Sequence, residues 1–205
     1  SPLCRIAGPD GRADRQRRLA TGRTNVENTV EYTVKNTIEG IVMSVAARPL
    51  GKDITVAGLV GLAHFASHFF QLVLPSLILF LKADFAVQCT ALGLLPTLLY
   101  GTSGLAQTPA GFLVDRFGAR RVLLSGLTLL SLATMATALA EAYWVLLPLA
   151  VLAGLGNSVF HPADLSILTS RIDPQRLGRA YGAHALCGNL GWAAAPILMV
   201  GIAHL

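Results

Sequence analysis

Charged residues are scarce in this sequence. Only 13% of its 205 residues are Asp, Glu, Lys or Arg, 53% are hydrophobic, and the mean hydropathy is positive. Soluble domains usually carry about 25% charged residues. The composition therefore argues against an ordinary water-soluble domain and favours a chain that is solvated mainly by lipid.

Cysteine is also rare. Cys4, Cys89 and Cys187 are odd in number, lie far apart and form no C-x-x-C pair, so neither a disulfide framework nor a thiolate metal site is indicated. The first forty residues lack the apolar core of a secretory signal peptide. We therefore expect the first apolar run to be retained as a helix.

Charge is absent from five long runs, at residues 54–81, 85–114, 122–140, 142–163 and 180–205. About 20 apolar residues in a helix cross the hydrocarbon core, and these runs are continuously apolar, without the alternation of a membrane β-barrel. We predict an all-α polytopic membrane protein with five transmembrane helices. Their expected bounds are about 55–81, 86–113, 121–140, 143–168 and 180–203.

The positive charges are distributed unevenly between the loops. Fifteen of the 16 Lys and Arg residues lie before Asp53, in the 111–121 loop or in the 171–179 loop. Positively charged loops stay in the cytoplasm, so we expect a cytoplasmic N-terminus in a plasma membrane of the bacterial inner-membrane type. The charge then marks topology, and no nucleic-acid partner is expected.

The chain divides into two parts by composition. Residues 1–52 are expected to form a cytoplasmic, largely disordered segment. Within it Val26, Val30, Val34 and Ile38 recur at the spacing of a short amphipathic helix. Residues 53–205 form a partial transmembrane domain. Met43 is a plausible natural start, which would make residues 1–42 upstream sequence.

The loop between the second and third predicted helices carries the pattern G-x-L-x-D-R-F-G-x-R-R, which resembles the loop motif of the major facilitator superfamily. The glycines suit close helix packing and a turn with positive φ, and the arginines suit anionic headgroups. In the family such a loop forms charge contacts that stabilise one state of the transport cycle. The matching residues are Gly111, Leu113, Asp115, Arg116, Gly118, Arg120 and Arg121.

Two further stretches resemble the fosmidomycin-resistance-like branch of this family. They are GLGNSVFHPADLSIL at 154–168 and GRAYGAHALCGNLGWAAAP at 178–196. The resemblance implies proton-coupled efflux of a drug or metabolite, with lipid, a small-molecule substrate and protons as partners, and with no catalytic chemistry and no cofactor. The arginine that many proton-coupled members carry in the fourth helix is absent from 122–170, so proton coupling comes from the resemblance alone.

Polar residues inside a bilayer are costly and usually face a cavity or a partner. His64, His68 and Gln71 share one face of the first helix and can line a substrate or proton path, bond a neighbouring helix, or, least favoured, bind zinc, for which two ligands are too few. His161 precedes Pro162, where a kink can expose a carbonyl or merely bend the helix. The remaining pathway candidates are Asn157, His184 and Asn189.

We expect Asp164 to lie near the cytoplasmic end of the fourth helix, where the helix dipole disfavours an anion. The hypothesis is that it pairs with Arg116 or Arg120 as part of an inner latch; the alternative is a solvated carboxylate. Gly182, Gly188 and Gly191 are expected to serve close helix packing. We predict no metal site.

Two rival functions remain open. Gly101–Gly104 reads G-x-S-G, as in intramembrane serine proteases, and with His184 could form a dyad. Transporters of the family have twelve helices in two halves, with the substrate between the halves. Five helices lack the C-terminal half, so the chain can equally be a non-transporting fragment or an assembly subunit.

Overall fold

The computed structural model describes residues 28–38 and 49–205, and the chain divides into the units Ser1–Ala47 and Arg48–Leu205. In the first unit residues 28–38 form an exposed helix, as the valine spacing predicts. The predictions for residues 1–27 and 39–48, the start at Met43 among them, lie outside the described residues. The second unit carries the membrane-spanning part.

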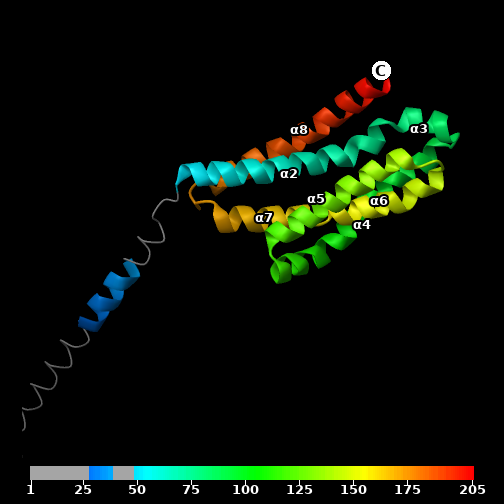
Figure 1. The fold of residues 1–205 in the computed structure, drawn as a ribbon. Helices are drawn as coiled ribbons and strands as arrows, with labels where there is room; N and C mark the ends of the chain where they lie inside the picture. Colours follow the sequence, from blue (N-terminus) through cyan, green and yellow to red (C-terminus); the bar gives the residue numbers. More distant parts are fainter. Residues whose placement is uncertain (1–27, 39–48) are drawn as a thin grey trace, which may run out of the picture. The chain divides into compact units, whose positions relative to one another are not determined.

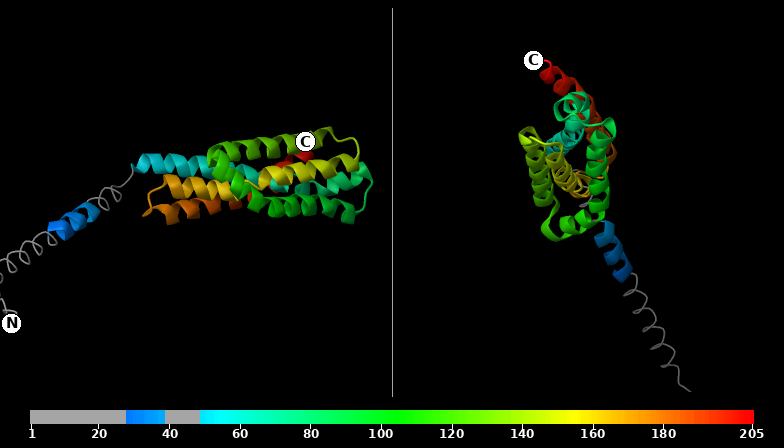
Figure 2. Two further views of the ribbon diagram at one scale, coloured as in Figure 1. Left: turned by 90° about the horizontal axis from the view of Figure 1, so that it is seen from below. Right: turned by 90° about the vertical axis from the view of Figure 1, so that its right-hand side faces the viewer.

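The second unit is built from helices, and the residues that the structure describes contain no strand. The chain folds back and forth along one bundle axis (Figures 1 and 2). The elements in order are α2 (Leu50–Ser76), α3 (Ile78–Phe85), α4 (Cys89–Phe117), α5 (Ala119–Ala136), the 3-10 turn η1 (Thr137–Leu139), α6 (Tyr143–Asn157), α7 (Phe160–Arg171) and α8 (Leu177–Ala203).

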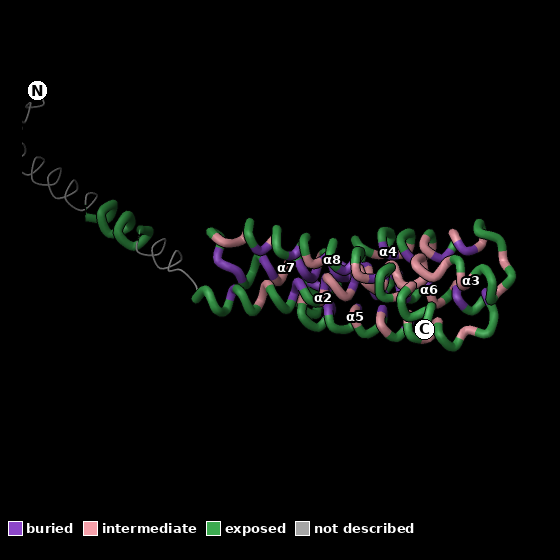
Figure 3. The backbone as a smooth tube through the Cα atoms, turned by 90° about the horizontal axis from the view of Figure 1, so that it is seen from above, coloured by how far each residue is buried: buried purple, intermediate pink, exposed green. Residues whose placement is uncertain are grey.

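Among the described residues, five segments are long and apolar enough to cross a membrane, which confirms the predicted all-α fold with five spans. The fourth span combines α6 and α7, and the third includes η1. Figure 3 shows buried residues on the inward sides of the helices and exposed residues outside. The spans are Leu50–Ser76, Cys89–Phe117, Ala119–Leu139, Tyr143–Arg171 and Leu177–Ala203.

The first span ends earlier than expected, because α2 stops at Ser76 and α3 starts after Leu77. Pro75 lies one residue before the end of α2. A proline has no N–H to bond the carbonyl four residues back, and the Leu77 N–H instead bonds the Leu74 carbonyl at 3.1 Å, in a tighter turn. The proline thus explains the early break.

Gly118 forms the turn between α4 and α5 with a φ of 87°. A side chain at this φ clashes with the backbone, so glycine suits the position, as the loop motif predicts. The turn lies towards the same end of the bundle as the start of α2 and the α7–α8 loop (Figure 2).

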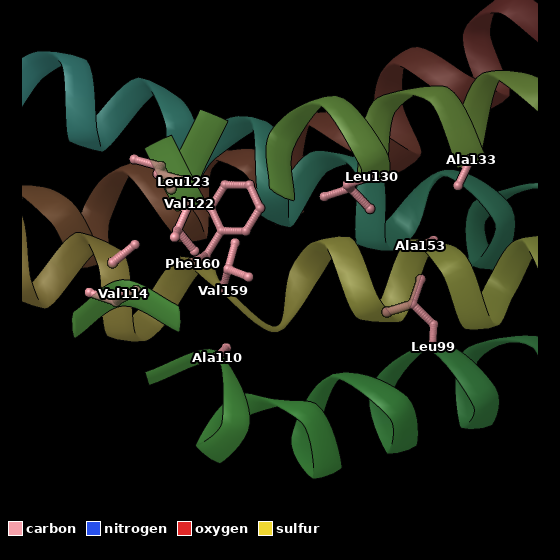
Figure 4. Packing of buried hydrophobic residues seen from close by; sticks show 11 residues of the cluster. Leu99, Ala110, Val114, Val122, Leu123, Leu130, Ala133, Ala153, Val159 and Phe160 are labelled. Atoms are coloured by element: carbon pink, nitrogen blue, oxygen red, sulfur yellow. The ribbon is translucent and has the colours of Figure 1, made fainter. Parts of the chain in front are cut away.

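The fourth span is interrupted between Asn157 and Phe160, where two turn residues join α6 to α7. Pro162 falls in the first turn of α7, where a missing N–H has no helical partner to lose. Val159 and Phe160 at this break are buried against side chains of α4 and α5 (Figure 4). The expected kink is thus a full break, packed into the core.

Glycines bring α2 and α8 close together. A Cβ atom on Gly191 would lie 2.3 Å from the Phe65 carbonyl oxygen, and one on Gly188 would lie 2.8 Å from His64 Cδ2. The packing prediction is therefore confirmed for these two residues. A Cβ on Gly182 or Gly111 would meet no atom within 4 Å, so within the described residues neither glycine lies at a close helix contact.

Candidate functional site

Three helices bring His64, Asp164 and His184 together inside the bundle. His64 Nδ1 on α2 lies 3.2 Å from Asp164 Oδ2 on α7, and His184 Nε2 on α8 lies 3.7 Å from the same oxygen. The two imidazole rings have centroids 3.7 Å apart. Close packing at Gly188 makes this stacking possible, because any side chain there would collide with His64.

This cluster is shielded from solvent. Asp164 is 0% exposed, His64 4% and His184 7%. Neither carboxylate oxygen of Asp164 has a partner with hydrogen-bond geometry, and the same holds for Nδ1 of His64 and of His184. A buried carboxylate without partners is unfavourable, so this cluster has capacity for a bound cation.

Two further histidines border the cluster. The His68 ring centroid lies 4.3 Å from that of His64, and its other side stacks on Trp192 at 4.5 Å. The His161 ring centroid lies 5.5 Å from that of His64, and this side chain is exposed. The structure thus gathers four of the predicted histidines from α2, α7 and α8 around one carboxylate.

A second polar group lies one turn further along α2 and joins three helices. Asn157 Oδ1 accepts hydrogen bonds from Ser67 Oγ at 2.8 Å and from Gln71 Nε2 at 3.0 Å. Asn157 Nδ2 donates to Ser103 Oγ on α4 at 2.9 Å, and Gln71 Nε2 also reaches Ser67 Oγ at 3.2 Å. Asn157 is the last residue of α6, and its side chain bonds to residues of α2 and α4.

The predicted pairing of Asp164 with Arg116 or Arg120 is wrong. Asp164 faces two imidazoles, and within the described residues no ion pair joins it to either arginine. The helix is interrupted before Phe160, so Asp164 lies in the second turn of α7. There the argument from a helix C-terminus does not apply.

The loop residues Asp115, Arg116, Arg120 and Arg121 are exposed at the end of the bundle. Asn189 is exposed on α8 and does not belong to the buried polar groups. These residues therefore keep their predicted roles only as proposals.

The G-x-S-G segment does not form a serine–histidine dyad. Ser103 Oγ accepts a hydrogen bond from Asn157, and the Nε2 of His184 faces Asp164. Serine activation needs a histidine nitrogen in hydrogen-bond reach of the hydroxyl, and this serine is held by an amide.

Sequence reasoning missed an ion-pair group at the loop end of the bundle. Arg176 Nε lies 2.8 Å from Oδ2 of the buried Asp53, which also accepts the backbone N–H of Asp173 at 3.2 Å. Arg176 Nη2 is 3.6 Å from Asp173 Oδ2. The available signal is Asp53 itself, a carboxylate directly before the first apolar run.

Sequence reasoning also missed the roles of Ser67 and Ser103 as partners of Asn157. Ser67 lies three residues after His64 and four before Gln71, so it shares their helix face. That spacing could have found it. Ser103 could not have been paired with Asn157 without knowing which faces of α4 and α6 meet.

The five-span fold agrees with a comparison to known proteins. The sequence model of the Major Facilitator Superfamily matches residues 59–205. The chain belongs to this superfamily. It is a family of membrane transport proteins and not of enzymes.

Curated relatives are modestly similar. The MFS-type transporter ppzB of Metarhizium majus is 28% identical over 63% of this chain and 29% of the relative. The multidrug resistance protein B homolog of Mycobacterium tuberculosis H37Rv is 32% identical over 43% of this chain and 16% of the relative. The fosmidomycin resistance protein of Escherichia coli K12 is 25% identical over 70% of this chain and 35% of the relative.

The matched region thus spans about a third or less of the length of these relatives. No solved structure gives a significant match.

Proposed function

We propose that this chain forms part of a transporter that exports a small molecule, a drug or metabolite, across the membrane in exchange for protons. It contributes helices of the N-terminal half, and a C-terminal half completes the substrate pathway. Two relatives, a multidrug resistance protein homolog and a fosmidomycin resistance protein, have names that support efflux.

The observation that carries the proposal is the set of polar side chains buried within apolar spans. The cluster of His64, Asp164 and His184 and the group around Asn157 both join α2 to other helices. Burying such groups in a bilayer protein is costly, so they are typical of substrate or ion pathways. Packing alone needs none of them.

The proton is the coupling ion in this proposal. Carboxylates and imidazoles both bind protons, and the fully buried carboxylate of Asp164 has two imidazoles beside it. A cation bound from one side of the membrane and released to the other would link this cluster to substrate movement.

The loop motif has the second role in the proposal. Gly118 makes the tight turn between α4 and α5. Four charged side chains around this turn are exposed: Asp115, Arg116, Arg120 and Arg121. There they can form charge contacts with another part of the complete transporter and favour one state of its cycle. Asp164 has no part in this latch.

The test is drug accumulation in a bacterial strain that lacks its own exporters. The chain is expressed alone and together with the C-terminal half of a related transporter, and retention of fosmidomycin and of a fluorescent multidrug substrate is measured. We expect retention to fall when both halves are present, and a protonophore to abolish the difference.

A matched control is Asp84→Asn, which changes an exposed carboxylate outside the buried groups and should leave retention unchanged. If the halves assemble in the membrane, as co-purification would report, and retention still equals that of cells without the chain, efflux is contradicted. The chain would then act as a non-transporting subunit.

A further inference from the structure

We propose that His64, Asp164 and His184 form a binding site for one divalent transition-metal ion, with Zn²⁺ as the best match. This inference does not depend on the transport proposal, because it concerns the coordination geometry of this chain alone. The three residues each offer one ligand atom, and these atoms all lie within 4.8 Å of one another.

The distances fit a tetrahedral ion. With Zn–N and Zn–O bonds of about 2.0–2.1 Å, ligand atoms on a tetrahedron lie about 3.3 Å apart. His64 Nδ1 and Asp164 Oδ2 are 3.2 Å apart, and His184 Nε2 and Asp164 Oδ2 are 3.7 Å apart. The two imidazole nitrogens lie within 4.8 Å of each other, so the rings must rotate towards the carboxylate to bring the three atoms onto one ion.

Two of the three ligand atoms lack a hydrogen-bond partner. His64 Nδ1 and both oxygens of Asp164 have no hydrogen-bond partner, although their side chains are buried. A divalent ion would satisfy these lone pairs and offset the carboxylate charge at a depth where water is scarce. Three ligands leave a fourth position for water or a substrate atom, as in open zinc sites.

The ligand types select the metal. Two imidazoles and one carboxylate suit Zn²⁺ and other first-row divalent metals, whereas Mg²⁺ and Ca²⁺ prefer oxygen ligands. The site differs from the zinc pair that the sequence offers, because His68 turns to Trp192 and is not one of the three ligands. The residues come instead from α2, α7 and α8, so a bound ion would connect three spans.

The test uses the full chain, purified in detergent, with Zn²⁺ and with Co²⁺ as a spectroscopic substitute. We expect one equivalent of either metal to bind, with the intense visible absorption of four-coordinate Co²⁺. Because replacing residues that merely support metal ligands already costs 10–100-fold in affinity, replacing a ligand should cost about 100-fold or more. The variants are Asp164→Asn and His64→Gln.

His204→Gln is the matched control, since it changes an exposed imidazole outside the ligand set and should keep the affinity within a few-fold. His184→Cys replaces one ligand by another and should add a sulfur-to-cobalt charge-transfer band. That band reports direct coordination, which a structural role cannot produce, and it decides the question if Asp164→Asn does not fold.

Absence of stoichiometric Co²⁺ binding by the folded chain would overturn the proposal. So would unchanged affinity in the folded Asp164→Asn and His64→Gln variants, or a folded His184→Cys variant that binds Co²⁺ without the sulfur band. Drug efflux can fail while metal binding persists, and the reverse, so the two proposals fail separately.

Discussion

His64 Nδ1 lies 3.2 Å from Asp164 Oδ2, although one hundred residues separate them in the chain. The contact joins α2 to α7 inside the bundle, and it places an imidazole beside a buried carboxylate. The stability of the bundle and the activity proposed for it should both depend on this pair.

Replacement of His64 by leucine should destabilise the chain. Leucine removes the imidazole that lies beside the buried carboxylate, and a buried polar group left without a polar partner costs about 1–3 kcal/mol. Asp164→Asn in the same background should restore much of the stability, because an amide carries no charge. Thermal unfolding in detergent measures both changes, with His204→Leu at the exposed chain end as the control. Simple additivity of the two substitutions would refute the coupling.

Asn157→Leu should lower the unfolding temperature strongly. It removes the partner of Ser67, Gln71 and Ser103 at once, and each buried polar group left unsatisfied costs about 1–3 kcal/mol. Asn189→Leu makes the same change at an exposed position of α8 and should have little effect. Equal unfolding temperatures for the two variants would show that the hydrogen bonds of Asn157 do not hold the helices together.

Gly191→Ala and Gly182→Ala form a matched pair on α8. At Gly191 the new Cβ would lie 2.3 Å from a backbone oxygen of α2, so the helices must separate, whereas at Gly182 it meets no atom within 4 Å. The first variant should lose stability. The second should keep or slightly gain it, since alanine favours a helix by about 0.5–1 kcal/mol over glycine. Thermal unfolding that ranks them in the opposite order contradicts the α2–α8 packing.

Asp53→Asn should loosen the α7–α8 loop. The buried carboxylate accepts Arg176 Nε at 2.8 Å and the Asp173 N–H at 3.2 Å. An uncharged amide loses the attraction to the arginine and weakens both contacts. A cysteine introduced by Gln175→Cys at an exposed loop position should react faster with a water-soluble maleimide in the Asp53→Asn background. Asp84→Asn serves as the control, and an unchanged labelling rate in Asp53→Asn would show that the ion pair does not restrain the loop.

The spans could be predicted from sequence because charge is so costly in lipid that its absence marks each helix. The turn at Gly118 followed from its motif. The partners of Asp164 could not be predicted, since they depend on which helix faces meet, and it faces two imidazoles from α2 and α8. Asp53 was missed because its partner Arg176 lies 123 residues further along the chain.

The most direct test of the central claim, that the buried polar cluster serves transport, is the initial efflux rate of the assembled transporter carrying Asp164→Asn, beside Asp84→Asn at equal expression. Our account predicts that the Asp164 variant loses nearly all efflux while it still assembles in the membrane, and that the Asp84 variant transports normally. Normal efflux by the Asp164→Asn transporter would contradict it.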